Sequence, residues 1–252
     1  MAGAAAVHDC PAVVGRVHSW DLSTGVDGPG TRLVVFLAGC PLRCLYCHTP
    51  DTWSSTGAVS PAAEIGDLIR RYRPFISMSG GGFTVSGGEP LQQPAFTQEL
   101  LRLAKRAGLH TALDTSGFLG RRASDALLDD TDLVLLDIKA GTEATHRALT
   151  GRPLAPTIEF ARRLAARGDT VWVRYVLVPG YTDDPAEIEL VAALAEELGN
   201  VDRVEVLSFH TLGQAKYDRL GIPFPLAGIE PPSPESVAAA RTAFARHGLR
   251  TL

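Results

Sequence analysis

Three cysteines lie close together near the start of the chain, at positions that favour metal chemistry. Cys40, Cys44 and Cys47 follow the spacing C-x3-C-x2-C within the stretch G-C-P-L-R-C-L-Y-C-H. Cysteine thiolates hold structural zinc ions and iron–sulfur clusters, and a closed site of either kind uses four ligands. The only other cysteine, Cys10, lies far upstream among small residues. The sequence therefore predicts a thiolate site and leaves open what occupies the fourth ligand position.

A zinc-binding interaction module is one interpretation of the same stretch. His48 follows Cys47 directly, and three cysteines with one histidine form a known structural zinc set. Neighbouring residues seldom reach one ion together, however, and small zinc modules usually carry paired C-x2-C arms. A non-enzymatic zinc module is therefore the less favoured alternative.

The composition disfavours several classes of protein. The chain has 252 residues, of which 45% are hydrophobic, and its formal net charge is −4. A chain of this size can bury a core, and its acidic balance argues against a nucleic-acid partner. No apolar run approaches the roughly 18 residues that span a bilayer, and the first residues lack the pattern of a signal peptide. We expect a cytoplasmic protein with no membrane partner, in which clustered cysteines bind metal rather than form disulfides.

The apolar pattern predicts alternating strands and helices that position these cysteines. Strands are expected at Val13–Asp21, Thr31–Leu37, Phe83–Val85, Thr111–Leu113, Leu133–Ile138, Val171–Val178 and Val204–Leu207. Helices are expected at Pro61–Tyr72, Pro94–Ala107, Ile158–Ala166, Pro185–Leu198 and Pro234–His247. Such alternation indicates an α/β fold with a parallel sheet and right-handed crossovers. The six βα units that begin at Thr31 suit an open, partial (β/α)6 barrel, preceded by a short N-terminal strand or hairpin. Residues 1–12 are expected to form a flexible tail, and residues 13–252 a single domain.

Polar residues and glycines follow nearly every predicted strand. Parallel α/β folds place their chemistry at the carboxyl ends of the strands, which meet around one mouth. The residues at these ends are Gly87, Gly88, Asp114, Thr115, Asp137, Lys139, Arg174 and His210. Each has an ordinary structural interpretation as a turn glycine, a helix cap, an ion-pair partner or a core histidine. Their joint placement nevertheless favours one shared pocket.

A series of motifs resembles a known family. The cysteine stretch, with an aromatic residue before its third cysteine, is similar to that of the radical S-adenosylmethionine (SAM) superfamily. The chain also carries D-G-P-G-T-R, S-G-G-G-F-T-V-S-G-G-E-P, L-D-T-S-G-F, T-D-L-V-L-L-D-I-K, V-W-V-R-Y-V-L-V-P-G and L-S-F-H-T-L-G. In this order, over roughly residues 13–250, they resemble the motifs of the glycyl-radical enzyme activases that act on pyruvate formate-lyase.

The resemblance implies a fold, a reaction and partners. It implies a radical-SAM barrel with one [4Fe-4S] cluster, in which SAM takes the coordination position that a fourth cysteine would block. Reductive cleavage of SAM then yields a 5′-deoxyadenosyl radical, which removes hydrogen from a glycine of pyruvate formate-lyase. The resemblance further implies a flavodoxin- or ferredoxin-type electron donor, a monomer, and a place in anaerobic glucose metabolism.

The resemblance also implies roles for individual residues. Cluster ligation is implied for Cys40, Cys44 and Cys47. Contact with SAM is implied for Tyr46, Cys47, His48, Gly87, Gly88, Asp137, Ile138, Lys139, Arg174 and His210. A monovalent cation, Na+ or K+, is implied at Asp114, Thr115, Leu135 and Asp137. Asp27 in D-G-P-G is implied to hold the backbone of the incoming glycine loop, and Cys10 is expected to be an ordinary free thiol.

Two rival enzymes share the same chemistry. One is an activase of another glycyl-radical enzyme, and many of these carry an inserted ferredoxin-like domain with further cysteines. In this chain the segment between Thr49 and the S-G-G-E motif is short and has no cysteine. The other is a radical SAM enzyme that acts on a small molecule. Both stay open as alternatives to activation of pyruvate formate-lyase.

Overall fold

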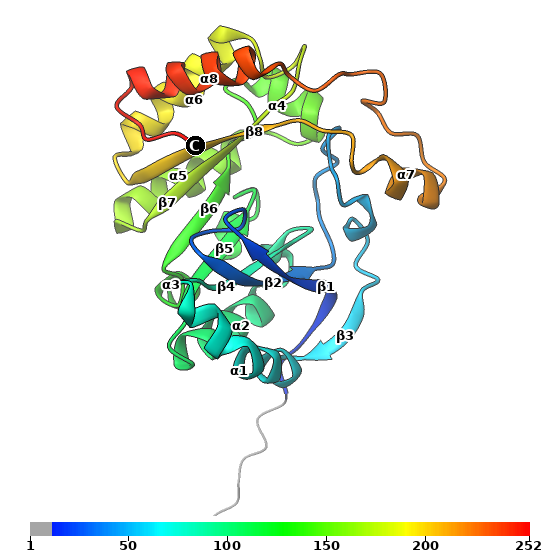
Figure 1. Cartoon of the computed structure of the whole chain (residues 1–252), viewed down its shortest axis with the longest axis vertical. Helices are drawn as coiled ribbons and strands as arrows, with labels where there is room; N and C mark the ends of the chain where they lie inside the picture. The colour runs from blue at the N-terminus through cyan, green and yellow to red at the C-terminus, as the bar shows by residue number, and fades with distance from the viewer. Residues whose placement is uncertain (1–11) are drawn as a thin grey trace, which may run out of the picture.

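One open sheet organises the chain. The computed structural model describes residues 12–252, and within them eight strands pair in the order β3-β1-β2-β4-β5-β6-β7-β8 (Figure 1). The strands are β1 (Val14–Thr24), β2 (Thr31–Leu37), β3 (Ala58–Pro61), β4 (Gly82–Gly87), β5 (His110–Thr115), β6 (Leu133–Asp137), β7 (Val171–Leu177) and β8 (Val201–Ser208). Strands β2 and β4 to β8 run parallel, whereas β1 pairs antiparallel with β2 and β3. Because β3 and β8 remain as edges, the partial barrel and its preceding hairpin are confirmed.

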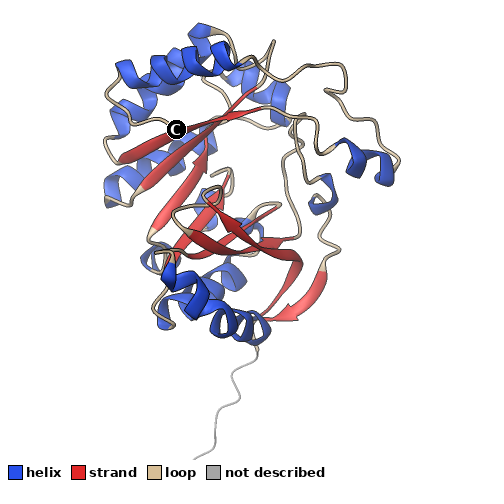
Figure 2. Cartoon of the chain, viewed as in Figure 1, coloured by secondary structure: helices blue, strands red, loops and turns tan. Residues whose placement is uncertain are grey.

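Most helices lie around the outside of the curved sheet, whereas α7 lies apart from it, beside η1 (Figure 2). They are α1 (Ala62–Met78), α2 (Pro94–Arg106), α3 (Asp125–Asp129), α4 (Glu143–Thr150), α5 (Ala155–Arg167), α6 (Pro185–Leu198), α7 (Gln214–Leu220) and α8 (Pro234–Arg246). The short 3-10 helices of the described residues are η1 (Pro50–Thr52), η2 (Pro90–Gln92) and η3 (Gly120–Arg122). Among residues 12–252, no helix is long and apolar enough to cross a membrane.

Most predicted elements are found, with some corrections. The bounds of β2 and α6 agree with the predicted ranges. The prediction that α1 ends at Tyr72 is wrong, because the helix continues through Pro74 and buries Ile76 completely in the core. The short elements β3, α3, α4 and α7 were not predicted, since they are too short for apolar periodicity to reveal them. The predicted tail lies almost wholly outside the described residues, and so does Cys10.

Alternation along the strands separates two environments. On β2, the side chains of Leu33, Val35 and Leu37 belong to the main core that the sheet shares with the surrounding helices. Since successive side chains in a strand point to opposite faces, Arg32 faces the interior of the barrel. A smaller cluster of Ala112, Leu133, Leu135 and Trp172 fills part of that interior. The face of the sheet toward the helices is thus apolar, whereas the face toward the barrel interior carries both apolar and charged side chains.

The edge strand β8 is paired by a distant segment. Val204 forms an isolated parallel bridge with Thr251. The amide of Val204 donates to the carbonyl of Arg250 at 2.8 Å, and the amide of Leu252 donates to the carbonyl of Val204 at 3.1 Å. Residues 250–252 therefore cover part of an edge that the open sheet would otherwise leave unpaired.

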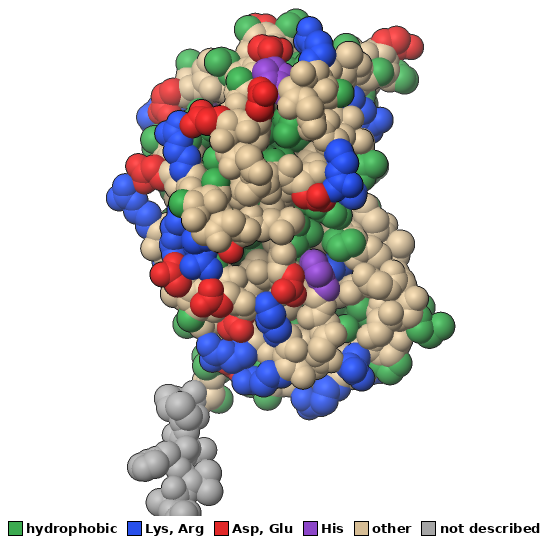
Figure 3. Space-filling model, turned by 90° about the vertical axis from the view of Figure 1, so that its left-hand side faces the viewer, with side chains coloured by type: hydrophobic (Ala, Val, Ile, Leu, Met, Phe, Trp, Pro, Cys, Tyr) green, Lys and Arg blue, Asp and Glu red, His purple; other side chains and the backbone are tan. Residues whose placement is uncertain are grey.

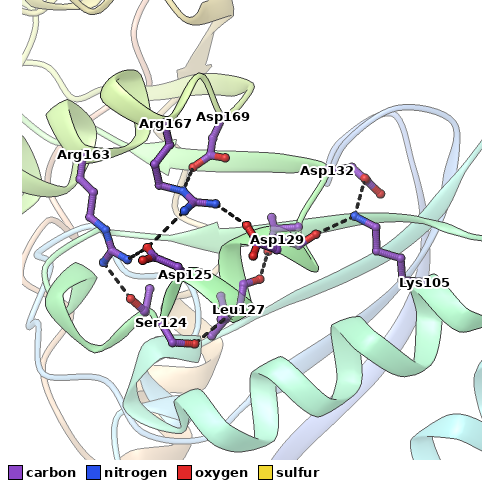
Figure 4. Close-up of polar contacts among 11 residues, drawn as sticks. Lys105, Ser124, Asp125, Leu127, Asp129, Asp132, Arg163, Arg167 and Asp169 are labelled. Atoms are coloured by element: carbon purple, nitrogen blue, oxygen red, sulfur yellow. Dashed lines mark hydrogen bonds and ion pairs between the residues drawn. The ribbon is translucent and has the colours of Figure 1, made fainter.

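A network of ion pairs joins helices on the outer surface. Figure 3 shows acidic and basic side chains interspersed over one face of the molecule. In Figure 4 the guanidinium of Arg167 on α5 contacts three carboxylates. Its Nη1 lies 3.2 Å from Asp125, its Nη2 lies 2.7 Å from Asp129, and its Nε lies 2.9 Å from Asp169. One arginine thus ties α3 to the end of α5.

We predict that Arg167→Met lowers the urea midpoint of unfolding, because three carboxylates lose their shared cation. The decrease should shrink in high salt, since salt screens charges that are partly exposed to solvent. Urea titrations followed by circular dichroism at low and high salt measure both effects. Arg162→Met is the matched control, because within the described part of the chain Arg162 has a single acidic partner, Glu197, at 3.4 Å. Equal midpoints for the two variants would contradict the prediction.

Candidate active site

A cavity of about 390 Å³ opens at the carboxyl ends of the parallel strands. Its volume falls within the range of small-molecule sites. All six parallel strands contribute to its lining, through Phe36, Ser86, Asp114, Asp137, Arg174 and Leu207 among others. The three cysteines and Asp27 line the same cavity. Residues from Asp27 to His210 are therefore brought to one place, including a turn that lies outside the strand ends.

The cysteine loop is held by main-chain hydrogen bonds at both ends, and Arg152 adds a side-chain bond of 2.8 Å to the carbonyl of Pro41. The amides of Gly39 and Cys40 donate to carbonyls of Thr52 and Trp53 at 2.7 and 3.2 Å. Farther along, the amides of Arg43 and Leu45 reach carbonyls at the end of α4, both at 2.9 Å. The loop is therefore clamped between η1 and α4. Its three cysteines are free thiols, with Cys44 buried and the other two partly exposed.

The thiols need a positive charge to become ligands. Burial raises the pKa of Cys40 to about 12 and that of Cys44 to about 11. Iron or another metal supplies the charge that favours deprotonation of such thiols. Within residues 12–252, no three His, Cys, Asp or Glu side chains gather closely enough to hold one metal ion.

Two glycines at the end of β4 allow close main-chain contact, Gly87 with the end of β2 and Gly88 with the cysteine loop. A Cβ at Gly88 would lie 2.4 Å from the carbonyl oxygen of Gly39, and one at Gly87 would lie 2.1 Å from the amide nitrogen of Leu37. Gly87 also has a φ of +124°, which favours glycine. The visible reason for glycine here is protein packing, although both residues also line the cavity.

Glu89 holds the neighbouring turns in place, a function that no pattern in the sequence indicates. Its buried carboxylate accepts hydrogen bonds from the hydroxyl of Thr115 at 2.7 Å and the amide of Ser116 at 3.0 Å. It also accepts from the amide of Leu91 at 3.1 Å. Meanwhile the amide of Glu89 donates to the carbonyl of Gly39 at 2.9 Å. One residue thus joins the cysteine loop, η2 and the end of β5.

Two buried ion pairs stand on the cavity wall. Lys139 donates to Asp137 at 2.9 Å, and its side chain is only 10% exposed, so this is not a surface pair. Arg174 contacts Asp114 at 3.0 Å, and Ser86 donates to the same carboxylate at 2.6 Å. Burial alone would lower the pKa of Lys139 and of Arg174, but neighbouring carboxylates more than offset it and raise both. Both cations therefore stay charged at neutral pH.

Among residues 12–252, the aromatic lining of the cavity includes one buried hydroxyl that has no hydrogen-bond partner. The hydroxyl of Tyr46 is buried without a hydrogen-bond partner, and the ammonium of Lys139 lies 5.5 Å from its ring centroid. The rings of His48 and His210 lie 5.8 Å apart, both on the cavity. Buried polar groups are normally paired, so the free Tyr46 hydroxyl is consistent with a polar ligand in the cavity. Of the predicted SAM contacts, only Ile138 lies elsewhere, because its side chain packs in the main core.

The predicted cation site lies beside this wall. Parallel pairing places Asp114 opposite Leu135 on the neighbouring strand. The hydroxyl of Thr115 donates to Glu89, and the carboxylates of Asp114 and Asp137 face Arg174 and Lys139. Their oxygens thus have protein partners, and cation binding stays a prediction.

Comparison with known proteins agrees with this geometry. Residues 34–206 match the family model of the radical SAM superfamily. A pyruvate formate-lyase 1-activating enzyme of Escherichia coli K12 is 39% identical over 96% of this chain and 99% of its own. A pyruvate formate-lyase-activating enzyme of Listeria monocytogenes is 45% identical over 90% and 95%. The chain belongs to the pyruvate formate-lyase-activating enzyme family of the radical SAM superfamily. A radical SAM methyltransferase from Sphaerobacter thermophilus shares the fold, with a TM-score of 0.65 at 20% identity over 96% of this chain and 76% of its own.

The cofactors of this radical SAM family fit the residues present. They are one [4Fe-4S] cluster and SAM. The donor set of Cys40, Cys44 and Cys47 suits a cluster, because soft thiolates favour iron–sulfur ligation. The free hydroxyl of Tyr46 and the charged pair of Asp137 and Lys139 face the adjoining space, where a polar, charged ligand such as SAM can be recognised.

We predict that Cys44→Ala loses most of its iron, because the two remaining thiolates would hold a cluster less firmly than three. The unmutated chain, purified or reconstituted without oxygen, should contain about four irons. Iron and sulfide analysis with absorption spectroscopy measures the difference. The control Cys10→Ser should keep its full iron content. Full iron in Cys44→Ala, or its loss in Cys10→Ser, would overturn the ligand assignment.

Proposed function

We propose that this protein generates a glycyl radical on pyruvate formate-lyase and so activates it. The observation that carries the proposal is the convergence of three free cysteines, two buried ion pairs and Asp27 on one cavity. The near full-length similarity to enzymes named for this activation supports the choice of partner. When bound, the reduced cluster and SAM supply a 5′-deoxyadenosyl radical, which can abstract hydrogen from a glycine α-carbon.

The protein's own residues bind and orient these groups. Cys40, Cys44 and Cys47 would hold the cluster and leave one coordination position open for SAM. Asp137 would accept a hydrogen bond from SAM, and Lys139 holds that carboxylate in place through their 2.9 Å contact. Tyr46 offers its free hydroxyl to the same ligand.

The outer part of the cavity is assigned to the nucleoside and the protein substrate. His48 and His210 stand at the exposed mouth, where the nucleoside of SAM would lie between them and Arg174. Asp27 lines the cavity as well, where its carboxylate can accept hydrogen bonds from the amides of an incoming glycine loop.

An electron donor, a cellular location and a bound cation complete the proposed function. A flavodoxin- or ferredoxin-type protein donates the electron, because the cluster must be reduced before SAM is cleaved. The protein works as a monomer in the cytoplasm, where reducing conditions keep thiols available for metal. Na+ or K+ binds beside Asp114, Thr115, Leu135 and Asp137.

We predict that Asp137→Asn weakens SAM binding about tenfold to a hundredfold, the usual effect of losing one charged hydrogen bond. Its iron content should not change, because Asp137 is not a cluster ligand. Anaerobic equilibrium dialysis with labelled SAM measures the affinity. Asp132→Asn is the matched control, since Asp132 also lies 2.9 Å from a lysine, Lys105, but outside the cavity. Unchanged affinity in Asp137→Asn would remove this residue from the SAM site.

The proposed function is tested by incubating the reduced, cluster-loaded chain with SAM and pyruvate formate-lyase without oxygen. Electron paramagnetic resonance should show a glycyl radical on the partner, and chromatography should show 5′-deoxyadenosine. Asp27→Asn should form at least tenfold less radical, because one charged contact with the glycine loop is lost. Asp21→Asn, on the exposed part of the same hairpin, should match the unmutated chain.

Two outcomes would contradict this view. SAM turnover without any glycyl radical from the unmutated chain would indicate another glycyl-radical enzyme or a small-molecule substrate. Radical yields of Asp27→Asn equal to those of Asp21→Asn would exclude Asp27 from recognition of the partner.

A further inference from the structure

Arg32 is a fully buried cation that the proposed chemistry does not use. It lies on β2 with 0% exposure, and among residues 12–252 no carboxylate lies within ion-pair distance of it. Its Nη2 donates to the carbonyl of Phe83 at 2.7 Å, and its Nη1 lies 3.0 Å from Nδ1 of His110. Burial lowers its pKa to about 10, so it is still charged at neutral pH. A buried charge is costly, and this one has hydrogen bonds that lead toward the D-G-P-G turn.

A hydroxyl connects Arg32 to the main chain of Asp27. The Nε of Arg32 donates to Oγ1 of Thr84 at 2.9 Å, and that hydroxyl lies 2.8 Å from the carbonyl oxygen of Asp27. A guanidinium can only donate, and a hydroxyl has one proton to give. The Thr84 proton must therefore point to Asp27. The direction of this chain of two hydrogen bonds is fixed by chemistry, and each bond polarises the other.

The glycines of the turn let it lie against the guanidinium. Gly28 has a φ of +117°, and a Cβ there would lie 3.3 Å from Nε of Arg32. On the neighbouring strand, a Cβ at Gly82 would lie 2.5 Å from Nη1 of the same side chain. The carbonyl of Pro29 is also 3.5 Å from Nη1. The spacing of D-G-P-G-T-R thus places an arginine where it can hold the turn that precedes it.

We propose that Arg32 and Thr84 are positioning residues for recognition of the protein substrate. Neither residue lines the cavity, whereas Asp27 does. Fixing the carbonyl of Asp27 from inside the barrel sets where its carboxylate meets the incoming glycine loop. This proposal rests on the proposed function, because it concerns how the partner's loop is held.

The test compares Thr84→Val with Thr84→Ser in the cluster-loaded protein. Valine keeps the shape but removes the hydroxyl, so the turn loses its bond and Nε of Arg32 loses its acceptor. The KM for pyruvate formate-lyase should rise about tenfold, as expected when one hydrogen bond of about 1.4 kcal/mol is lost. The kcat at saturating partner and the slow cleavage of SAM without partner should change less than twofold. Thr84→Ser should restore the unmutated KM, because it restores the hydroxyl.

Thr111→Val is the matched control for loss of a buried threonine hydroxyl. Thr111 is also fully buried, on the adjacent strand β5, and its hydroxyl donates to the carbonyl of Asp130 at 2.8 Å. Asp130 lies away from the cavity. This variant should lose stability in urea titrations without any change in KM for the partner.

Several results would overturn the proposal. One is a KM of Thr84→Val that equals the KM of the unmutated chain. Another is a rise in KM of Thr84→Ser or Thr111→Val that equals the rise in Thr84→Val. If Thr84→Val does not fold, Gly28→Ala replaces it, because a Cβ there pushes the turn from Arg32 without removing a hydrogen-bonding group. An unchanged KM in a folded Gly28→Ala would overturn the proposal equally. These results differ from failure of the proposed function, in which the unmutated chain itself would form no glycyl radical.

Discussion

The main-chain contact between Gly39 and Gly88–Glu89 is the constraint on which the site depends. It brings the cysteine loop against the end of β4 at a separation that leaves no room for a Cβ at residue 88. The carboxylate of Glu89 then extends this contact to the end of β5. The cysteines are therefore placed by peptide groups, which have few soft degrees of freedom. A site whose ligands must match a rigid inorganic cluster benefits from such support.

Most charged side chains inside the barrel form ion pairs with a neighbour of opposite charge. Asp114 and Arg174 form one pair and Asp137 and Lys139 another, while Arg32 relies on neutral acceptors. Burying any of these charges without a partner would be costly. The oppositely charged partner, or for Arg32 the neutral acceptors, offsets part of that cost. The result is an interior that is polar and yet ordered, in which a charged ligand meets groups that are already oriented.

Much of the fold follows from the sequence, because segments such as those of β2 and α6 are long and apolar enough to be recognised as a buried strand and a helix. The strand ends could likewise be named, since a parallel sheet brings them together wherever they lie in the chain. The function of Glu89 and Arg32 could not be foreseen in this way. A lone acid after two glycines, or a lone arginine in a strand, looks the same whether it is exposed or buried. Only the register with β4 and β5 shows what each of them touches. Gly88 was identified from its motif, but the packing reason for glycine required the position of Gly39.

An open sheet carries a risk of its own. An enzyme that acts on a loop of another protein benefits from a barrel wall that is incomplete, but incomplete walls expose strand edges that invite pairing with other chains. At one edge, β3 is only four residues long and ends in Pro61, which has no amide to donate. At the other, residues 250–252 occupy part of the β8 edge through Val204. By occupying part of this edge, the residues around Thr251 reduce the backbone that is available for pairing with another chain.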